Sequence, residues 1–286
     1  MIDLSLGRRL ILMIFIVHIP DSRPASGADK ANEPLYEEFL VLPLRVHLLK
    51  AESLPEVNCS LTDEDVGRVI RKVNGIWNKA GLHWGLETIV REEAAGQERF
   101  RLARDLGSGG NLGMYRMLLP EESKLFEGQH VYYLHKFPVN GVWLGNEVAI
   151  VQETAKLRAV DGGIDEPLPR VTAHELGHAL GLPHRQDTTN LLASGTTGTL
   201  LISAEIDIAR KTARRLRGVK TVAELEAKAN ENAEAGELGA ARTIWKCLEQ
   251  IPGGETGAKK NLELLKGRDG GVGEKSQSSR RVEYKE

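Results

Sequence analysis

One eleven-residue segment constrains the fold of this chain more than any other. Residues 174–184 read His-Glu-Leu-Gly-His-Ala-Leu-Gly-Leu-Pro-His. Side chains four residues apart share one face of a helix, so His174 and His178 should point at a common centre from successive turns. Gly181 can adopt the left-handed conformation that ends a helix, and a sharp turn there would return His184 to the same centre. The segment therefore predicts a helix whose end folds back to gather three imidazoles.

Three neutral imidazoles form a donor set for a catalytic zinc ion, because they leave a fourth tetrahedral position for water. Zinc would lower the pKa of that water to about 7, and Glu175, adjacent to His174, is placed to accept its proton and pass it to a leaving amine. The alternative is a chance histidine cluster on a helix surface, which the added glycine and third histidine make rare, on the order of one in ten thousand. We therefore predict one zinc ion held by His174, His178 and His184, with Glu175 as general base.

These residues match the zinc-binding consensus of the metzincin metalloproteases at each defined position, so the chain resembles that family. Residues 190–198 and 201–206 also resemble the family's turn beneath the metal and the start of its C-terminal helix. The family places a methionine in this turn, whereas this chain has Leu192, whose similar volume could still form an apolar floor. Arg185 differs from the residues that matrixins, adamalysins and astacins place there, so the subfamily is unassigned.

The resemblance implies an α+β fold. It implies a metzincin-like catalytic domain with a mixed twisted sheet above the active-site helix, a small irregular subdomain below it, and an extended substrate in the cleft between them. Gly181, Asn190 and Leu192 would support the site. The family's edge strand lines the cleft, and residues 147–152 are the candidate for it.

Hydrophobic patterning predicts the first strands and helix of such a domain. Residues 42–48 and 82–90 alternate apolar and polar side chains, as half-buried strands do. Between them, Thr62 is a candidate N-cap for a helix of about five turns that Gly81 closes. The order strand, helix, strand favours a sheet with a helix on one face.

Further elements follow the same reasoning. Residues 105–113 are glycine-rich and predict a loop, and residues 130–135 and 147–152 predict two more strands. A helix is expected from Pro167 through the two histidines, and another between residues 203 and 217. Together these elements are consistent with a mixed sheet backed by helices.

The first 28 residues have the order of a secretory signal peptide. Arg8 and Arg9 precede the apolar residues 10–17, and small residues 25–28 follow. An uncleaved membrane anchor is the alternative, but the apolar run is well short of the roughly 20 residues that span a bilayer. We therefore predict cleavage after Ala28, a secreted or otherwise extracytoplasmic protein, and no stable membrane span.

The remaining boundaries are set by composition. Residues 35–218 are predicted to form the zinc metallopeptidase domain, residues 219–266 a helical hairpin, and residues 267–286 a disordered tail. Within the hairpin the spacing of Gly236, Ala241 and Trp245 faintly resembles half of a tetratricopeptide repeat. One repeat cannot bury its own face, so the hairpin is expected to pack on the protease or on a protein partner.

Several other candidate sites are weaker. Residues 161–166 gather three carboxylates, which a calcium loop or a flexible acidic loop would explain. Cys59 and Cys247 could pair or stay free, and nothing in the sequence brings them together. A formal net charge of −2 gives no electrostatic reason to expect nucleic acid. The other histidines in strand-like segments are expected to be surface or structural residues rather than ligands: His47, His83, His130 and His135.

The sequence thus predicts a secreted zinc-dependent endopeptidase that acts on protein or peptide substrates. Two alternatives stay open. A catalytically weak or inactive binding protein on a protease-like fold has Leu192 as its only support in the sequence. A metallohydrolase for small substrates would use the same zinc site.

Overall fold

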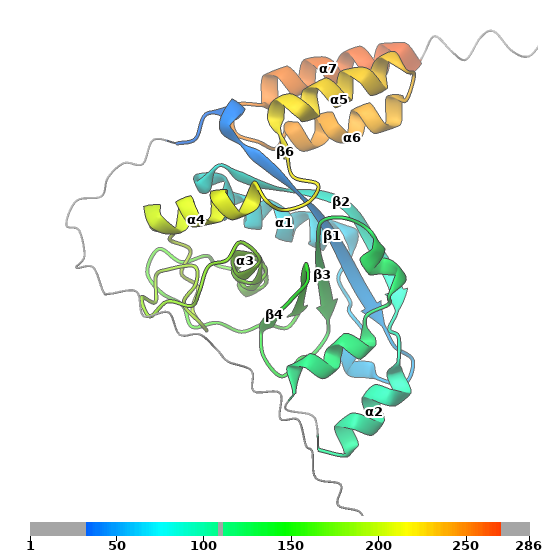
Figure 1. Ribbon diagram of the computed structural model, residues 1–286, viewed down its shortest axis with the longest axis vertical. Helices are drawn as coiled ribbons and strands as arrows, with labels where there is room; N and C mark the ends of the chain where they lie inside the picture. The colour runs from blue at the N-terminus through cyan, green and yellow to red at the C-terminus, as the bar shows by residue number, and fades with distance from the viewer. Residues whose placement is uncertain (1–32, 108–110, 270–286) are drawn as a thin grey trace, which may run out of the picture. The chain divides into compact units, whose positions relative to one another are not determined.

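The computed structural model describes residues 33–107 and 111–269 (Figure 1). The predicted signal peptide, residues 1–28, lies outside the described residues. Of the predicted disordered tail, residues 267–286, the first three belong to a helix, Glu255–Asp269, and residues 270–286 lie outside the described residues. A mixed sheet packs against helices, and further helices follow at the C-terminal end. The predicted α+β fold class is therefore confirmed.

The sheet has the strand order β2-β1-β3-β5-β4. Neighbouring strands are parallel except at one edge, where β4 (Gly141–Gly145) pairs antiparallel with β5. A two-residue strand, β6 (Lys220–Thr221), pairs antiparallel with the start of β1 at Leu40 and Val41. The parallel strands are β1 (Leu40–Lys50), β2 (Leu82–Glu93), β3 (Gln129–Leu134) and β5 (Val148–Gln152).

The edge strand beside the helix that carries His174 and His178 is β4 rather than residues 147–152, so the prediction for the edge strand is wrong. β5 lies between β3 and β4, and its residues 148–151 are all buried. A continuous apolar run is typical of an interior strand, which indicates why β5 does not form the edge. β4 has only five residues and ends at Gly145, so its periodicity is too short to detect in the sequence.

The first helix forms where the sequence places it. α1 (Asp63–Trp77) begins with a capping box, in which the Thr62 hydroxyl accepts from the Asp65 N–H at 3.1 Å and the Asp65 carboxylate accepts from the Thr62 N–H at 3.0 Å. A short 3-10 turn, Asn78–Ala80, follows. Gly81 then has a φ of 65°, so the chain leaves the helix through a left-handed residue and enters β2.

One face of the sheet buries the helix that carries His174 and His178. Leu42, Leu44 and Val46 of β1 pack with α1 and with α3 (Pro167–Ala179) in one apolar cluster. The Trp77 indole N–H of α1 donates to the Ala173 carbonyl of α3 at 3.3 Å. These contacts fix α3 under the sheet, with its histidine-bearing turns next to β4.

The opposite face is covered by a segment that the sequence leaves largely unassigned. α2 (Gln97–Asp105) and two 3-10 helices (Leu112–Leu118 and Glu122–Leu125) lie between β2 and β3. Phe100 is the only buried residue of α2, so this helix has no apolar periodicity that would predict it. Part of the loop expected at residues 105–113 is taken up by the ends of these helices, and residues 108–110 lie outside the described residues.

The C-terminal segment forms three helices where a hairpin was expected. After α4 (Ser203–Ala213), α5 (Val222–Glu234) and α6 (Leu238–Leu248) lie side by side, and α7 (Glu255–Asp269) packs on α6 (Figure 1). Trp245 and Leu248 of α6 join an apolar cluster with Phe39 and Val41 at the start of β1. The three helices therefore bury one face against the sheet.

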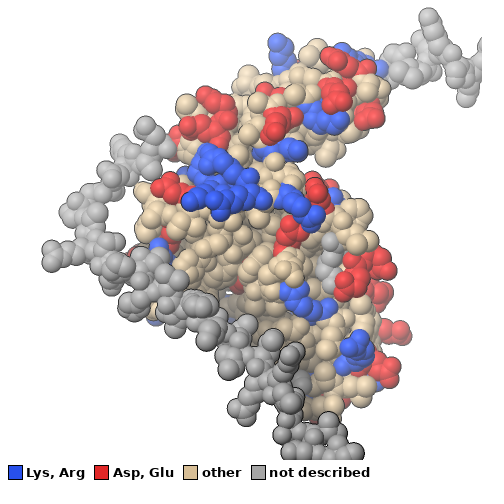
Figure 2. Space-filling view, viewed as in Figure 1, with Lys and Arg blue, Asp and Glu red and all other residues tan. Residues whose placement is uncertain are grey.

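Charges of both signs are interspersed over the face shown in Figure 2, with one basic area over α4. Arg210, in the last turn of α4, donates to the carbonyls of Ala80 and Gly81 at 3.0 Å and to that of Glu38 at 2.9 Å. This arginine therefore ties α4 to the turn before β2. Among residues 33–107 and 111–269, no helix combines the length and apolarity needed to cross a membrane.

Candidate metal centre and active site

The helix α3 and the turn after it bring three predicted ligands together. Proline at the first position of α3 needs no N–H partner there, and the helix then carries His174 and His178 on successive turns. Gly181 has a φ of 81°, and the chain reverses so that His184 returns to the helix. The Nε2 atom of His178 lies 3.2 Å from the Nε2 atoms of both His174 and His184. Among the described residues, this is the one cluster of three ligand-type side chains that could hold a metal ion.

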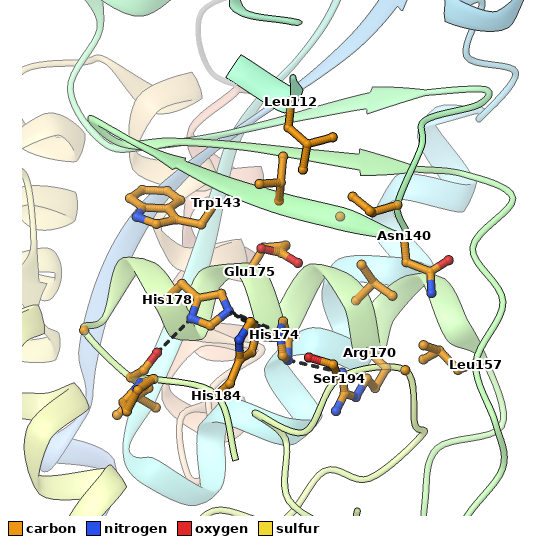
Figure 3. Close-up of a pocket in the computed structure, with 18 residues that line it drawn as sticks. Leu112, Asn140, Trp143, Leu157, Arg170, His174, Glu175, His178, His184 and Ser194 are labelled. Atoms are coloured by element: carbon orange, nitrogen blue, oxygen red, sulfur yellow. Dashed lines mark hydrogen bonds between the residues drawn. The ribbon is translucent and has the colours of Figure 1, made fainter. Parts of the chain in front are cut away.

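The outer nitrogen of two of these rings is bound to the backbone. His174 Nδ1 lies 2.8 Å from the Leu191 carbonyl oxygen. His178 Nδ1 lies 2.8 Å from the Leu182 carbonyl oxygen (Figure 3). A carbonyl only accepts, so Nδ1 of His178 carries the hydrogen and its Nε2 keeps its lone pair. Nδ1 of His174 also lies 3.2 Å from Nη1 of Arg170, which can only donate, but the Leu191 carbonyl is nearer and favours the same tautomer for His174. Such contacts fix the tautomer and orientation of histidine ligands in metal sites.

The three imidazoles are held in the neutral form. Burial lowers the pKa of His174 to about 3 and also lowers the pKa of His178 and His184. The Nε2 atom of His178 lies 3.2 Å from each of the other two Nε2 atoms, and lone pairs that close repel one another unless a cation lies between them. Zinc–nitrogen bonds of about 2.0–2.1 Å in a tetrahedron place the nitrogens about 3.3 Å apart, so the observed spacing fits zinc.

Glu175 lies beside the histidines in a buried position. It is 5% exposed, and burial raises the pKa of its carboxyl group to about 8. The backbone N–H of Trp143 in β4 and the charge of Arg170 oppose this rise. A cation held by the histidines would lower this pKa again and favour the carboxylate form that a general base needs.

The three histidines and Glu175 share one cavity of about 700 Å³ between β4, α3 and the segment after it (Figure 3). Trp143 of β4 lies above the histidines in this view, and Arg170 and Ser194 lie to one side. The wall is mainly apolar, with a few polar groups near the histidines, as is common in ligand sites. Its apolar lining includes Leu112, Val139, Val142, Leu157, Leu182 and Pro183.

The predicted supporting residues lie beneath the helix. The Asn190 side chain accepts from the Leu192 N–H at 2.7 Å and donates to the buried Glu205 carboxylate at 2.8 Å. Leu192 is fully buried, and its Cδ1 lies 3.2 Å from where a Cβ of Gly177 would be. Leu192 therefore packs against α3 at the turn between His174 and His178.

Arg170 is a site residue that the sequence analysis missed. It is 1% exposed, and its guanidinium donates to the carbonyls of Gly198 at 3.0 Å, Asn190 at 3.3 Å and Ala193. Burial lowers its pKa to about 10, so it remains charged at neutral pH. Arg170 lies one turn before His174 on the same helix face, and this spacing was the available signal.

The other candidate sites have structural explanations. The acidic loop at residues 161–166 pairs with α1, because Asp165 contacts Lys72 at 2.8 Å and Glu166 contacts both Lys72 and Arg68. Cys59 and Cys247 are both free. Cys59 is buried and its thiol donates to Glu153 at 3.3 Å, away from the residues that line the cavity.

The remaining histidines of strand-like segments bind other side chains. His47 lies between Glu92 at 2.7 Å and His130 at 2.9 Å, on the sheet face opposite α3. His83 lies between Asn74 and Asn78, and His135 binds Glu153 at 2.6 Å. None of these four lines the cavity.

No protein-family model matches the chain, and no curated protein matches it. Archaemetzincin from Methanopyrus kandleri overlaps 61% of this chain and 96% of its own at 16% identity, with a TM-score of 0.37. Metalloproteinase-II from Bacteroides fragilis overlaps 60% of this chain and 53% of its own at 13% identity, with a TM-score of 0.36. A chain in the structure of a chaperone–substrate complex overlaps 62% of this chain at 12% identity, with a TM-score of 0.38.

The chain spans about a third of the length of the matched chain in the chaperone–substrate complex, and about half of the Bacteroides metalloproteinase. All of these TM-scores are below 0.5. The functional assignment therefore depends on the geometry of the site.

Proposed function

We propose that this protein is a zinc-dependent endopeptidase in which His174, His178 and His184 hold the metal and Glu175 is the general base. The observation that carries the proposal is the convergence of three Nε2 lone pairs beside a buried carboxylate in one cavity. Bound zinc would supply a Lewis acid that lowers the pKa of water and polarises a peptide carbonyl.

The residues of the chain account for the other requirements of peptide hydrolysis. The Leu191 and Leu182 carbonyls orient His174 and His178, and Leu192 supports the helix from below. The Glu175 carboxylate accepts a proton from the attacking water and returns it to the leaving amine nitrogen.

An extended peptide suits the shape and composition of the site. β4 is an edge strand that pairs with one neighbour only, so a peptide could add to its other side. The Trp143 N–H there contacts Glu175, and the Leu144 and Gly145 carbonyls accept from Arg116, so pairing would use the other backbone groups of β4 or replace these contacts. The cavity beside it is mainly apolar and would accept an apolar side chain of the peptide. These features favour a peptide bond within a chain as the substrate.

Export is part of the same proposal. The basic, apolar and small residues of positions 1–28 support removal of a signal peptide and action outside the cytoplasm. Sequencing the N-terminus of protein recovered from the culture medium or periplasm tests this, and an intact Met1 on exported protein would contradict it.

The test combines zinc stoichiometry with cleavage of a denatured generic protein. We expect one zinc ion per chain, cleavage that phenanthroline abolishes, and a Glu175→Gln variant that retains zinc but loses at least about 100-fold in kcat, at the lower end of general-base effects. Glu263→Gln, a change at an exposed position on α7, is the matched control and should keep full activity.

Other results of the zinc and cleavage assays would favour the alternatives or refute the proposal. Zinc binding without any cleavage would favour the protease-like binding protein. Cleavage of amidated dipeptides but not of longer chains would favour a small-substrate hydrolase. Absence of zinc, or a Glu175→Gln variant as active as the parent, would refute the proposal.

A further inference from the structure

The edge strand β4 passes so close to α3 that only glycine fits at position 141. A Cβ on Gly141 would lie 2.9 Å from both Cγ and Oε1 of Glu175, and 2.8 Å from Cγ1 of Val171. Carbon atoms in packed proteins touch at about 3.5–4.0 Å, so the side chains of Glu175 and Val171 together occupy the space that a side chain at 141 would need.

The need for glycine comes from this contact rather than from the backbone. Gly141 is not among the residues with positive φ, so any residue could adopt its conformation. Gly145, at the other end of β4, is the opposite case: its φ is 78° and a Cβ there would meet no atom within 4 Å. Gly141 is therefore the position in β4 where space alone requires glycine.

The approach of β4 to α3 is fixed by the residue before Gly141. The Asn140 side chain accepts from the Gln152 side-chain amide at 3.0 Å and from the Lys156 N–H at 3.1 Å, and it donates to the Lys156 carbonyl at 2.8 Å. The backbone carbonyl of Asn140 also accepts from the backbone N–H of Gln152 at 3.0 Å. These four bonds tie the start of β4 to the chain after β5, so β4 has little freedom to retreat from a larger side chain.

The helix α3, which carries Glu175, is also held in place. The Trp77 contact and the cluster under β1 fix its backbone. Val171, one turn earlier on the same face, also touches the Gly141 position. Val171 is β-branched and stiff at χ1, and neither backbone can yield easily, so a methyl group at 141 would be accommodated mainly by moving the flexible side chain of Glu175.

We propose that Gly141 is a positioning residue that sets the location of the Glu175 carboxylate. This inference rests on the proposed function in so far as Glu175 is the general base, but the contact itself can be tested without any activity. A group that transfers protons must lie within hydrogen-bond reach of the reacting atoms, and a displacement of about 1 Å can cost roughly 100-fold in rate.

The kinetic test compares Gly141→Ala with Gly75→Ala, the matched control. A Cβ at Gly75 in α1 would meet nothing within 4 Å. Gly141→Ala is expected to lower kcat by about 10- to 100-fold, with KM and zinc affinity within about threefold of the parent, since the histidines do not touch position 141. Gly75→Ala should change none of these quantities. Unchanged kcat in Gly141→Ala would overturn the proposal.

The stability test uses a double-mutant cycle in urea and needs no substrate. Gly141→Ala should lower the unfolding midpoint in the parent, and the decrease should be smaller in a Glu175→Ala background, where the Glu175 contacts are absent and only that of Val171 remains. An equal decrease in both backgrounds would show that Glu175 does not fill the space, which would also overturn the proposal. If the parent shows this coupling but no peptidase activity, the positioning contact stands and the proposed function fails.

Discussion

Replacing Arg170 with leucine should loosen the segment that carries the floor of the site. The guanidinium of Arg170 donates to three backbone carbonyls that lie 20, 23 and 28 residues further along the chain, at Asn190, Ala193 and Gly198. This side chain therefore joins α3 to the irregular segment between His184 and α4. A leucine at position 170 would occupy part of the same buried space, but its side chain has no hydrogen-bond donor.

The size of the effect follows from these contacts. A hydrogen bond to a charged group contributes roughly 1.5–3 kcal/mol, so three would total about 5 kcal/mol at the lower figure. Arg170 is 1% exposed and has no carboxylate within salt-bridge distance among the described residues, so removing it also relieves the desolvation of a buried charge. We therefore expect a net loss of about 3 kcal/mol in the free energy of unfolding.

The Arg170→Leu variant should also bind zinc more weakly than the parent. The Leu191 carbonyl, which fixes the ring of His174, lies between two of the carbonyls that Arg170 holds. Loss of such an outer contact typically weakens metal binding by about 10- to 100-fold. Arg170→Lys should also be defective, because a lysine keeps the charge but lacks the planar fork that reaches several carbonyls at once.

The assay is urea unfolding of the zinc-free protein together with chelator competition for zinc. Arg101→Leu on α2 is the control, since Arg101 is exposed, and its unfolding free energy should stay within about 0.5 kcal/mol of the parent. If Arg170→Leu stays within that same margin and binds zinc as tightly as the parent, the reasoning about this arginine is refuted.

Two further predictions concern buried side chains. Leu192 is fully buried against α3, so Leu192→Ala should lower the free energy of unfolding by about 2–5 kcal/mol. Leu192→Met should keep that free energy within about 1.5 kcal/mol of the parent and bind zinc normally. Equal urea midpoints for the two variants would contradict this. Burial lowers the pKa of His83 from 6.5 to about 4, so the unfolded chain binds a proton at a higher pH than the folded protein. The contribution of His83 to the free energy of unfolding should be complete above pH 6.5 and should fall by on the order of 3 kcal/mol as the pH drops from 6.5 to 4. Urea unfolding of zinc-free parent and His83→Gln between pH 8 and 4 measures this, and parallel stability curves would argue against it.

The sequence by itself determined the local geometry of the metal centre. The four-residue spacing of His174 and His178 and the turn at Gly181 depend only on helix geometry and on the freedom of a glycine backbone, so no distant contact is needed to predict them. The capping box at Thr62 and the left-handed end at Gly81 were predictable for the same reason. The two-residue period likewise identified β1 and β2.

Only the tertiary structure decided what surrounds that centre. β4 lies at the sheet edge because β5 pairs with β3 on its other side, which the five residues of β4 do not encode. Gly141 against Glu175, and Arg170 beside the histidines, depend on contacts between residues 20 or more apart in the chain. Short elements such as β4 and sparsely apolar ones such as α2 and α7 carry too little periodicity to be recognised in the sequence. A side chain's burial and the space beside it depend on how whole elements pack, and local spacing does not encode that packing.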